Sequence, residues 1–153
     1  MRKPYFPYRK GNPSPLRVQV ERRVRFEETD QLAIVWHGRY ASFFEDVRSA
    51  AGEQYGIGYM DFYNNGVIAP IRIMHMDFHH PLRFNETIAI EGIFHWSDAA
   101  RINIEYIIRN SEGLLSTTGY TVQVLLDNEN NLLLIPPPFY RDFREKWRRG
   151  EFS

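Results

Sequence analysis

The sequence predicts an α+β fold in which an antiparallel sheet wraps around one long central helix and a short helix ends the chain. Two observations support this fold class. A single strand-like run is followed by a long amphipathic run, and about four further strand-like runs then follow one another through short turns. Consecutive strands joined by short turns favour antiparallel pairing over alternating α/β units.

The 153 residues are enough for one domain with its own core. Nineteen basic and nineteen acidic residues cancel, so no global field draws the chain to nucleic acid or to anionic membranes. The absence of cysteine excludes disulfides and thiolate nucleophiles. No apolar run approaches the ~20 residues of a membrane span, and we expect a cytoplasmic protein without a membrane span.

Residues 1–16 predict an N-terminal tail, because four prolines and four basic residues interrupt any regular pattern. The tail either stays loosely ordered or docks through Tyr5, Phe6 and Tyr8, on the domain or on a second subunit. Residues 17–153 are expected to form the single domain.

Apolar and polar residues alternate through residues 17–26, which predicts a half-buried strand with Arg22 as the one polar residue on its apolar side. Residues 40–51 place apolar side chains at helical spacing and predict an amphipathic helix of roughly four turns. This helix should end within residues 52–58, where Gly56 and Gly58 supply backbone freedom.

Residues 67–78 are rich in strand-forming residues, and Pro70 marks an edge strand or a bulge. Alternation predicts further strands at residues 88–96, 102–108 and 114–126. Three prolines at residues 136–138 then precede a short charged helix at residues 139–149.

The segment of residues 26–48 joins the first strand to the long helix and holds Asp30 and His37 in the loop between them. Loops held by rigid elements often carry chemistry. Amide N–H groups at the start of the helix, near His37 and Gly38, lack intrahelical partners and lie at its positive end. They would polarise a carbonyl oxygen without a metal. The alternative interpretation of Asp30 is an N-cap or Asx-turn residue.

This segment resembles the 4-hydroxybenzoyl-CoA thioesterase family of the hotdog fold, including the Tol-Pal-associated acyl-CoA thioesterases. The matching residues are R-F-E-E-T-D at 25–30, W-H at 36–37, Tyr40, F-F-E at 43–45 and Arg48. G-V-I-A-P at 66–70 and H-P-L-R-F at 80–84 extend the similarity, which covers roughly residues 18–137.

The resemblance implies hydrolysis of acyl-CoA or a related acyl thioester, with Asp30 as nucleophile or as general base for water. It assigns the His37 N–H to the oxyanion and leaves the His37 imidazole as a pocket or Asp30-orienting group. It also implies a homodimer or homotetramer without cofactor or metal, in which residues of a second subunit line the pocket opposite Asp30. The expected substrate-binding residues are Trp36, Tyr40, Ile68, Ile71 and Arg72.

Two departures from the family pattern stand out. Ala33 occupies a position where many relatives have glycine, within a bulky segment at residues 32–36 where substrate preference is expected to be decided. Asn85 and Glu86 replace a common glycine and aspartate, which we expect to be a conservative turn change.

On the helix, Glu45 and Arg48 are spaced for a structural ion pair.

Two other groups of residues could bind a ligand, but we favour an ordinary structural or solvent-exposed role for both. His75, Asp77 and His79 would share one face of a strand, with His80 beside them, and such a set can bind a divalent metal. Basic side chains suited to the phosphates of coenzyme A are Arg72, Arg83, Arg101, Arg109, Arg141, Arg144, Lys146, Arg148 and Arg149.

Three other functions stay open. The first is a hotdog dehydratase, which the position of Asp30 before the helix disfavours. The second is a non-catalytic module that binds acyl-CoA, and the third is an acyl-carrier-protein thioesterase.

Overall fold

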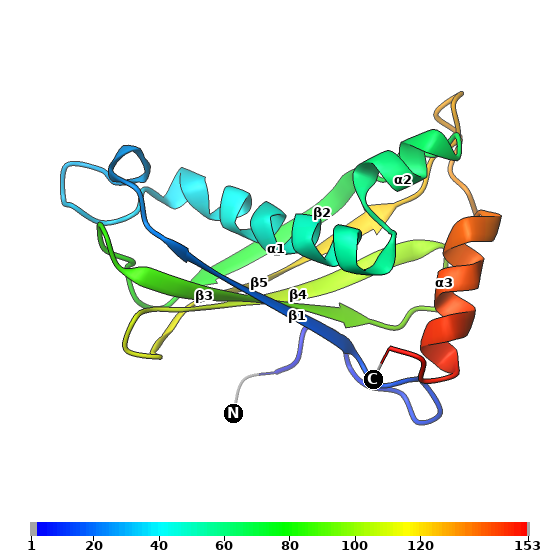
Figure 1. The fold of residues 1–153 in the computed structure, drawn as a ribbon, viewed down its shortest axis with the longest axis horizontal. Coiled ribbons are helices and arrows are strands. Elements are labelled where there is room, and N and C mark those ends of the chain that lie inside the picture. The colour runs from blue at the N-terminus through cyan, green and yellow to red at the C-terminus, as the bar shows by residue number, and fades with distance from the viewer. Residues whose placement is uncertain (1–2, 153) are drawn as a thin grey trace.

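The computed structural model describes residues 3–152 and has the α+β architecture that the sequence predicts (Figure 1). Within these residues, five strands form one sheet, accompanied by three α-helices and two short 3-10 turns. In chain order the elements are β1 (Leu16–Arg23), η1 (Phe26–Glu28), η2 (His37–Arg39), α1 (Tyr40–Tyr55), α2 (Tyr59–Asn64), β2 (Ile71–Phe78), β3 (Thr87–His95), β4 (Arg101–Arg109), β5 (Leu115–Val124) and α3 (Pro138–Arg148).

All neighbouring strands pair antiparallel, in the order β1-β3-β4-β5-β2. β2 is therefore an edge strand, and it begins directly after Pro70. Its register against β5 shifts between Ile71 and Ile73. The prediction that Pro70 marks an edge or a bulge is thus confirmed, since proline cannot donate a backbone hydrogen bond within a sheet.

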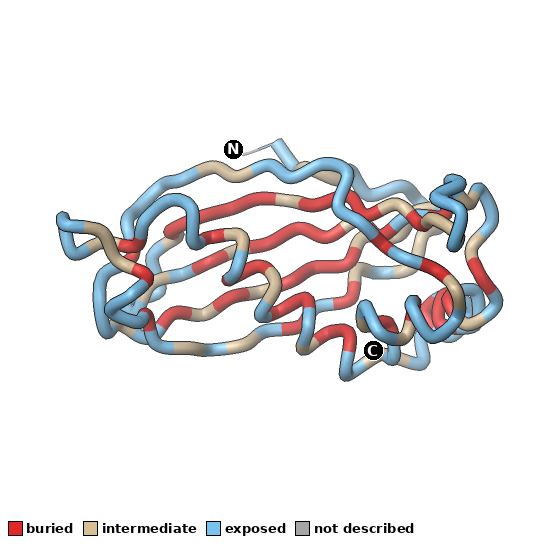
Figure 2. Tube along the Cα trace, turned by 90° about the horizontal axis from the view of Figure 1, so that it is seen from above, coloured by how far each residue is buried: buried red, intermediate tan, exposed pale blue. Residues whose placement is uncertain are grey.

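Helix α1 lies across one face of the sheet and forms the centre of the core (Figure 1). Phe43, Phe44 and Val47 are buried beneath it, and the Phe44 ring stacks on Tyr106 with ring centroids 4.2 Å apart. Gly119 makes this close approach possible, because a Cβ there would lie 2.9 Å from the Phe44 ring and closer still to a backbone oxygen of β2. The sheet is buried along its central strands and exposed along β2 (Figure 2).

Helix α1 ends as predicted, because Gly56 adopts a left-handed φ of +70°. Helix α2 was not predicted. It has only six residues, and its amphipathic pattern is too short to recognise. Asp61 stabilises its start by accepting a hydrogen bond from the Gly58 N–H at 2.8 Å.

The predicted ion pair between Glu45 and Arg48 is wrong. Arg48 is only 1% exposed, and its guanidinium donates to the Gln123 side chain at 2.9 Å and to the Ile57 carbonyl at 2.8 Å. Glu45 instead accepts a hydrogen bond from the Tyr59 hydroxyl at 3.1 Å. Arg48 therefore ties α1 to β5 and to the turn before α2 instead of bonding along its own helix.

The N-terminal segment packs on the face of the sheet opposite α1. The Tyr5 hydroxyl donates to Asp77 of β2 at 2.6 Å, and the Phe6 ring contacts His95 and Tyr120. Of the alternatives left open for the tail, the described part thus docks on its own domain.

Helix α3 begins at Pro138, close to the predicted position, and closes the opposite end of the molecule from the start of α1 (Figure 1). Its buried Trp147 donates to the Ser14 carbonyl at 2.8 Å, which joins the two termini of the domain. Within residues 3–152, no helix is both long and apolar enough to cross a membrane.

Candidate active site

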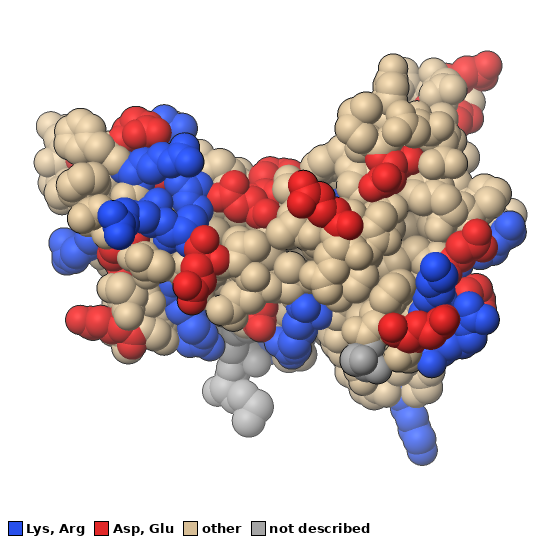
Figure 3. All heavy atoms as spheres, in the orientation of Figure 1, with Lys and Arg blue, Asp and Glu red and all other residues tan. Residues whose placement is uncertain are grey.

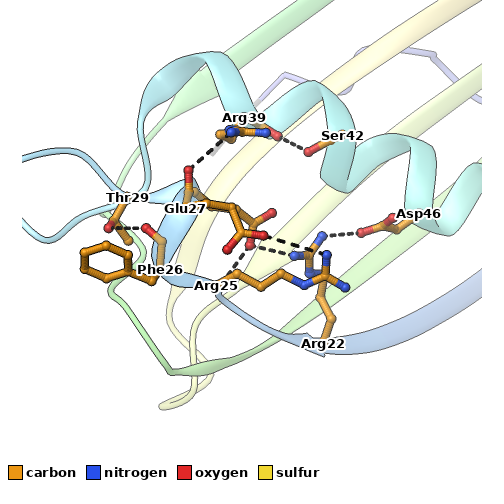
Figure 4. A network of polar contacts seen from close by, with 9 residues as sticks. Arg22, Arg25, Phe26, Glu27, Thr29, Arg39, Ser42 and Asp46 are labelled. Atoms are coloured by element: carbon orange, nitrogen blue, oxygen red, sulfur yellow. Dashed lines mark hydrogen bonds and ion pairs between the residues drawn. The ribbon is translucent and has the colours of Figure 1, made fainter.

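A partly buried ion-pair network fixes the segment that leads into the candidate site (Figure 4). Arg22, the polar residue on the apolar side of β1, bonds Glu28 at 2.6 Å and Asp46 of α1 at 2.7 Å. Its guanidinium also lies over the Phe43 ring. Glu28 is 5% exposed and also accepts the Arg25 N–H at 2.8 Å. The network therefore holds η1 against both β1 and α1.

Asp30 lies in a tight loop that closes on itself. Its N–H donates to the Ile34 carbonyl at 2.9 Å, and its carbonyl accepts the Ala33 N–H at 3.0 Å. The Asp30 Oδ1 atom accepts the Leu32 N–H at 2.8 Å, which is an Asx turn. Among the described residues, Oδ2 has no hydrogen-bond partner, so one oxygen orients the half-buried carboxylate while the other remains available.

Ala33 adopts the left-handed φ of +62° that glycine would take without strain. The departure from the family pattern therefore falls on a position that favours glycine. Asn85, the other substituted glycine position, has φ of +68°. Asparagine tolerates this conformation better than most residues, so the change at Asn85 is conservative, as predicted.

The residues after this loop begin a short 3-10 turn that runs into α1. The Trp36 N–H donates to the Glu28 carbonyl at 2.9 Å, and the Arg39 N–H donates to the Trp36 carbonyl at 2.9 Å. His37 and Gly38 lie between them, in the first turn, where helical geometry offers their N–H groups no acceptor. The Trp36 ring covers Gly38 so closely that a Cβ would collide with it.

An apolar cavity of about 340 Å³ opens beside this first turn. His37 and Tyr40 line it from the helix side, and the Tyr40 ring meets Phe78 edge-on with centroids 4.9 Å apart. The complete lining is Ile34, Val35, His37, Tyr40, Phe78, His79, His80 and Pro81. The cavity thus combines an apolar wall with the positive end of α1.

Tyr40 is a wall of this cavity and not a base. Its ring is buried, and burial raises the pKa of its hydroxyl above the usual 10.0, against the lowering effect of hydrogen bonds with Leu82, Ser116 and Thr117. The phenol therefore stays protonated at neutral pH.

The structure brings together only part of the predicted site. Asp30, Trp36, His37, Gly38 and Tyr40 lie in one continuous stretch at the start of α1. The other predicted substrate-binding residues lie at the far end of β2, where Ile68 pairs with Leu126 and β2 begins beside the end of β5. They are Ile68, Ile71 and Arg72, and all three are exposed.

Sequence reasoning missed the segment of residues 78–81 as a cavity wall. The sequence predicts Phe78 only as a strand residue and His79 only as a possible metal ligand, and the family resemblance at His80 assigns it no place in a cavity. The backbone N–H groups of His79 and His80 both donate to the Ser116 carbonyl, at 2.7 and 3.1 Å. This long-range contact holds them beside the start of β5, and no local sequence signal predicts it.

The possible metal set is divided among other contacts. Asp77 accepts hydrogen bonds from Tyr5 and from His75, the latter at 2.9 Å, and His79 bonds Thr118 at 3.2 Å. Within residues 3–152 no group of three or more His, Asp or Glu side chains is arranged to hold a metal ion.

Several of the basic candidates for phosphate have structural partners. Arg144 donates to the carbonyls of Ser97 and Ala99, and Arg148 lies over the Trp96 ring. Arg109 donates to a carbonyl, and Arg149 pairs with Glu151. Across the described part of the chain, no acceptor bonds the side chains of Arg72, Arg83, Arg101, Arg141 and Lys146.

A family model described as the thioesterase-like superfamily matches residues 24–146, which include the loop, the cavity and most of α3. The chain belongs to this superfamily. The predicted hotdog fold and the prediction of a thioesterase enzyme are thereby confirmed at the level of the family.

Curated relatives and solved structures agree with this membership. A putative acyl-CoA thioesterase of Bacillus subtilis is 29% identical over 72% of this chain and 80% of its own length. An acyl-acyl carrier protein thioesterase of Arabidopsis thaliana is 30% identical over 77% of this chain, which spans 63% of that relative. A DHNA-CoA thioesterase structure from Staphylococcus aureus has the same fold, with a TM-score of 0.78, 23% identity and coverage of 88% and 91%.

Proposed function

We propose that this protein hydrolyses acyl-CoA thioesters to a free acid and coenzyme A. The observation that carries the proposal is the position of His37. This residue both begins the turn that leads into α1 and lines the apolar cavity, and Ile34, whose carbonyl accepts the Asp30 N–H, lines the same cavity. An acyl group in the cavity would thus have its carbonyl near free amide N–H groups and a carboxylate.

The amide N–H groups of His37 and Gly38 are the proposed oxyanion donors. Negative charge develops on the thioester oxygen as the carbonyl carbon becomes tetrahedral, and fixed N–H dipoles at a helix start stabilise it. Because these are backbone groups, the His37 imidazole stays free to line the acyl cavity.

Asp30 acts in one of two ways. As a nucleophile, its carboxylate oxygen attacks the thioester carbon and expels the thiolate, and water then hydrolyses the resulting anhydride. As a general base, it takes a proton from a water molecule that attacks the same carbon. Both routes use the carboxylate oxygen without a partner and release the same products.

The cavity is proposed to be completed by a second subunit joined through β2. Two-fold pairing of two β2 strands would run antiparallel and set the start of one strand against the end of the other. Since Phe78 ends β2 and lines the cavity, Ile71 and Arg72 of a second subunit would come close to it. Exposed apolar side chains at this edge, Ile73 and Met74 among them, support the pairing.

The similarity to an acyl-acyl carrier protein thioesterase supports a second candidate function, the hydrolysis of acyl thioesters carried by an acyl carrier protein. Narrower membership, in the 4-hydroxybenzoyl-CoA thioesterase family, stays a prediction.

Thiol release from short, long and aromatic acyl-CoAs, compared with the same acyl groups on carrier protein, tests the proposal. We expect turnover of at least one acyl-CoA. Turnover of carrier-protein thioesters alone would favour the second candidate. Acyl-CoA binding without thiol release would instead identify a non-catalytic binding module.

A further inference from the structure

Two phenylalanines at the loop end of the sheet are exposed and contact each other. Phe26 opens η1 and is 76% exposed, and Phe84 follows β2 and is 49% exposed. Their rings meet edge-to-face with centroids 5.7 Å apart. The sequence pattern places Phe26 on the apolar side of the first strand, but its ring turns outward, away from the ion-pair network (Figure 4). Large exposed aromatic groups of this kind are often binding surfaces.

A second cavity, of about 420 Å³, lies beside Phe84. Its lining includes Arg83, whose guanidinium has no acceptor within residues 3–152. The Arg83 guanidinium forms no ion pair with the nearby Glu86 carboxylate, whose oxygens accept the Arg83 N–H at 2.6 Å and the Ser111 N–H at 2.9 Å. Glu86 keeps its negative charge, and Glu112 is the other acidic residue of the lining. The guanidinium of Arg83 is thus a cation without an ion-pair partner, in a hollow that it shares with two carboxylates.

This second cavity adjoins the proposed active site. Pro81 lines both cavities, so the segment of residues 78–86 runs from one to the other. Ile34 of the Asp30 loop pairs with Arg83, and the Phe84 N–H donates to the Ala33 carbonyl at 3.4 Å. A ligand that reaches from the acyl cavity over this loop would arrive at Arg83 and the two phenylalanines.

The surface here carries both basic and acidic side chains. Basic side chains gather over the end of the molecule where α1 begins, with acidic side chains among them (Figure 3). Arg25, next to Phe26, is largely exposed, and its closest carboxylate, that of Glu27, is 4.0 Å away. Such an exposed, distant pair contributes little, so Arg25 adds to the charge available to an anion.

We propose that Phe26, Phe84 and Arg83, with Arg25 at the rim, bind the phosphorylated adenosine end of coenzyme A. This inference rests on the proposed function. A flat base can stack on an aromatic ring, and arginine binds phosphate through its planar fork of donors. The subsite would make the enzyme select coenzyme A over a carrier protein, since the phosphopantetheine arm of a carrier protein has no adenosine.

The test compares an acyl-CoA with the N-acetylcysteamine thioester of the same acyl group, which lacks the nucleotide. For wild type we expect kcat/KM for acyl-CoA to exceed that for the truncated thioester by at least tenfold. Arg83→Gln and Phe84→Ala should each reduce this ratio about tenfold, mainly through the KM for acyl-CoA. The matched control is Arg141→Gln, which removes an exposed, unpaired arginine of α3 and should leave the ratio unchanged.

A wild-type ratio near one, or a ratio that neither variant changes, would overturn the subsite. Titration of free coenzyme A into the protein separates this failure from failure of the proposed function. Binding that is about tenfold weaker in Arg83→Gln and Phe84→Ala supports the subsite even if no thioester is hydrolysed. Equal binding by wild type and both variants contradicts it, whatever the hydrolysis assay shows.

Discussion

At the scale of single residues, Ala33 is the strained position of the candidate site. Its φ of +62° is unfavourable for a residue with a Cβ. Ala33→Gly removes this strain and adds some entropy to the unfolded chain, so we expect a net stabilisation of about 0.5–1 kcal/mol. Urea denaturation measures the change.

Asn85→Gly is the matched control, because Asn85 has a similar φ but a side chain that tolerates it. Its gain should be smaller, within a few tenths of a kcal/mol. A destabilised Ala33→Gly variant would show that the alanine methyl group makes contacts that outweigh the strain.

Glu28 is the residue that anchors the loop to β1. Glu28→Gln keeps the shape of the side chain but removes the charge that pairs with Arg22, so we expect a loss of about 1–2 kcal/mol in the free energy of unfolding. Glu27→Gln, at an exposed neighbour, should change stability by less than about 0.5 kcal/mol. Equal effects of the two changes would contradict the anchoring role.

Local sequence pattern was a partial guide at this scale. It identified Arg22 as an exception to the apolar side of β1, and the family resemblance identified Ala33 as an exception to a glycine position. The structure gives a physical reason for both. It failed for Arg48, because helical spacing suggested Glu45 while the true partners are contributed by β5 and the Ile57 turn. Spacing along a helix carries no information about such distant acceptors.

At the scale of elements, β2 is an edge strand with exposed apolar side chains and is proposed to pair with a second copy. Ile73 is 45% exposed on this edge. Ile73→Asp places a charge in the proposed interface and should shift the protein from dimer to monomer, as measured by sedimentation velocity. Gln19→Asp on β1, the other edge, should leave the assembly unchanged. A dimer that persists in Ile73→Asp would exclude the β2 interface.

Long elements with a clear period were predictable, and short or distant features were not. Sixteen residues of α1 and the alternating strands carry a strong pattern, whereas the six residues of α2 do not. The cavity wall at residues 78–81 depends on pairing with β5 across the sheet. A pattern confined to neighbouring residues cannot show which strands meet.

At the scale of the whole molecule, the N-terminal segment is held on the outer face of the sheet by Asp77. Hydrogen bonds from Tyr5 and His75 lower the pKa of this carboxyl below its usual 3.8, and His79 contributes in the same direction. A lowered pKa means that the contact stabilises the docked segment above about pH 4 and is lost as the pH falls through the folded-state pKa. Docking should therefore be complete at neutral pH.

Asp77→Asn should release the segment at neutral pH. We expect several-fold faster tryptic cleavage after Arg9 and Lys10, because the Tyr5 hydroxyl loses its charged acceptor. Asp142→Asn, an exposed carboxylate on α3, is the control. Unchanged cleavage in Asp77→Asn would show that the aromatic contacts of Tyr5 and Phe6 hold the segment without the carboxylate.

The arrangement of the whole molecule was predictable as a class but not in detail. The order of elements indicated one sheet around one helix, and the resemblance placed Asp30 in the candidate site. The sequence could not indicate that the tail docks on its own sheet, or that Phe26 and Phe84 from separate segments meet. Both features depend on the strand order.

The central claim is that the Asp30 carboxylate performs the hydrolysis. Thiol release from the best acyl-CoA substrate by Asp30→Asn tests it most directly, since asparagine keeps an oxygen that can accept the Leu32 N–H but is neither a base nor an effective nucleophile. Our account predicts a fall in kcat of about 10²–10⁴-fold with stability unchanged within about 1 kcal/mol. Hydrolysis by Asp30→Asn at the wild-type rate would contradict it.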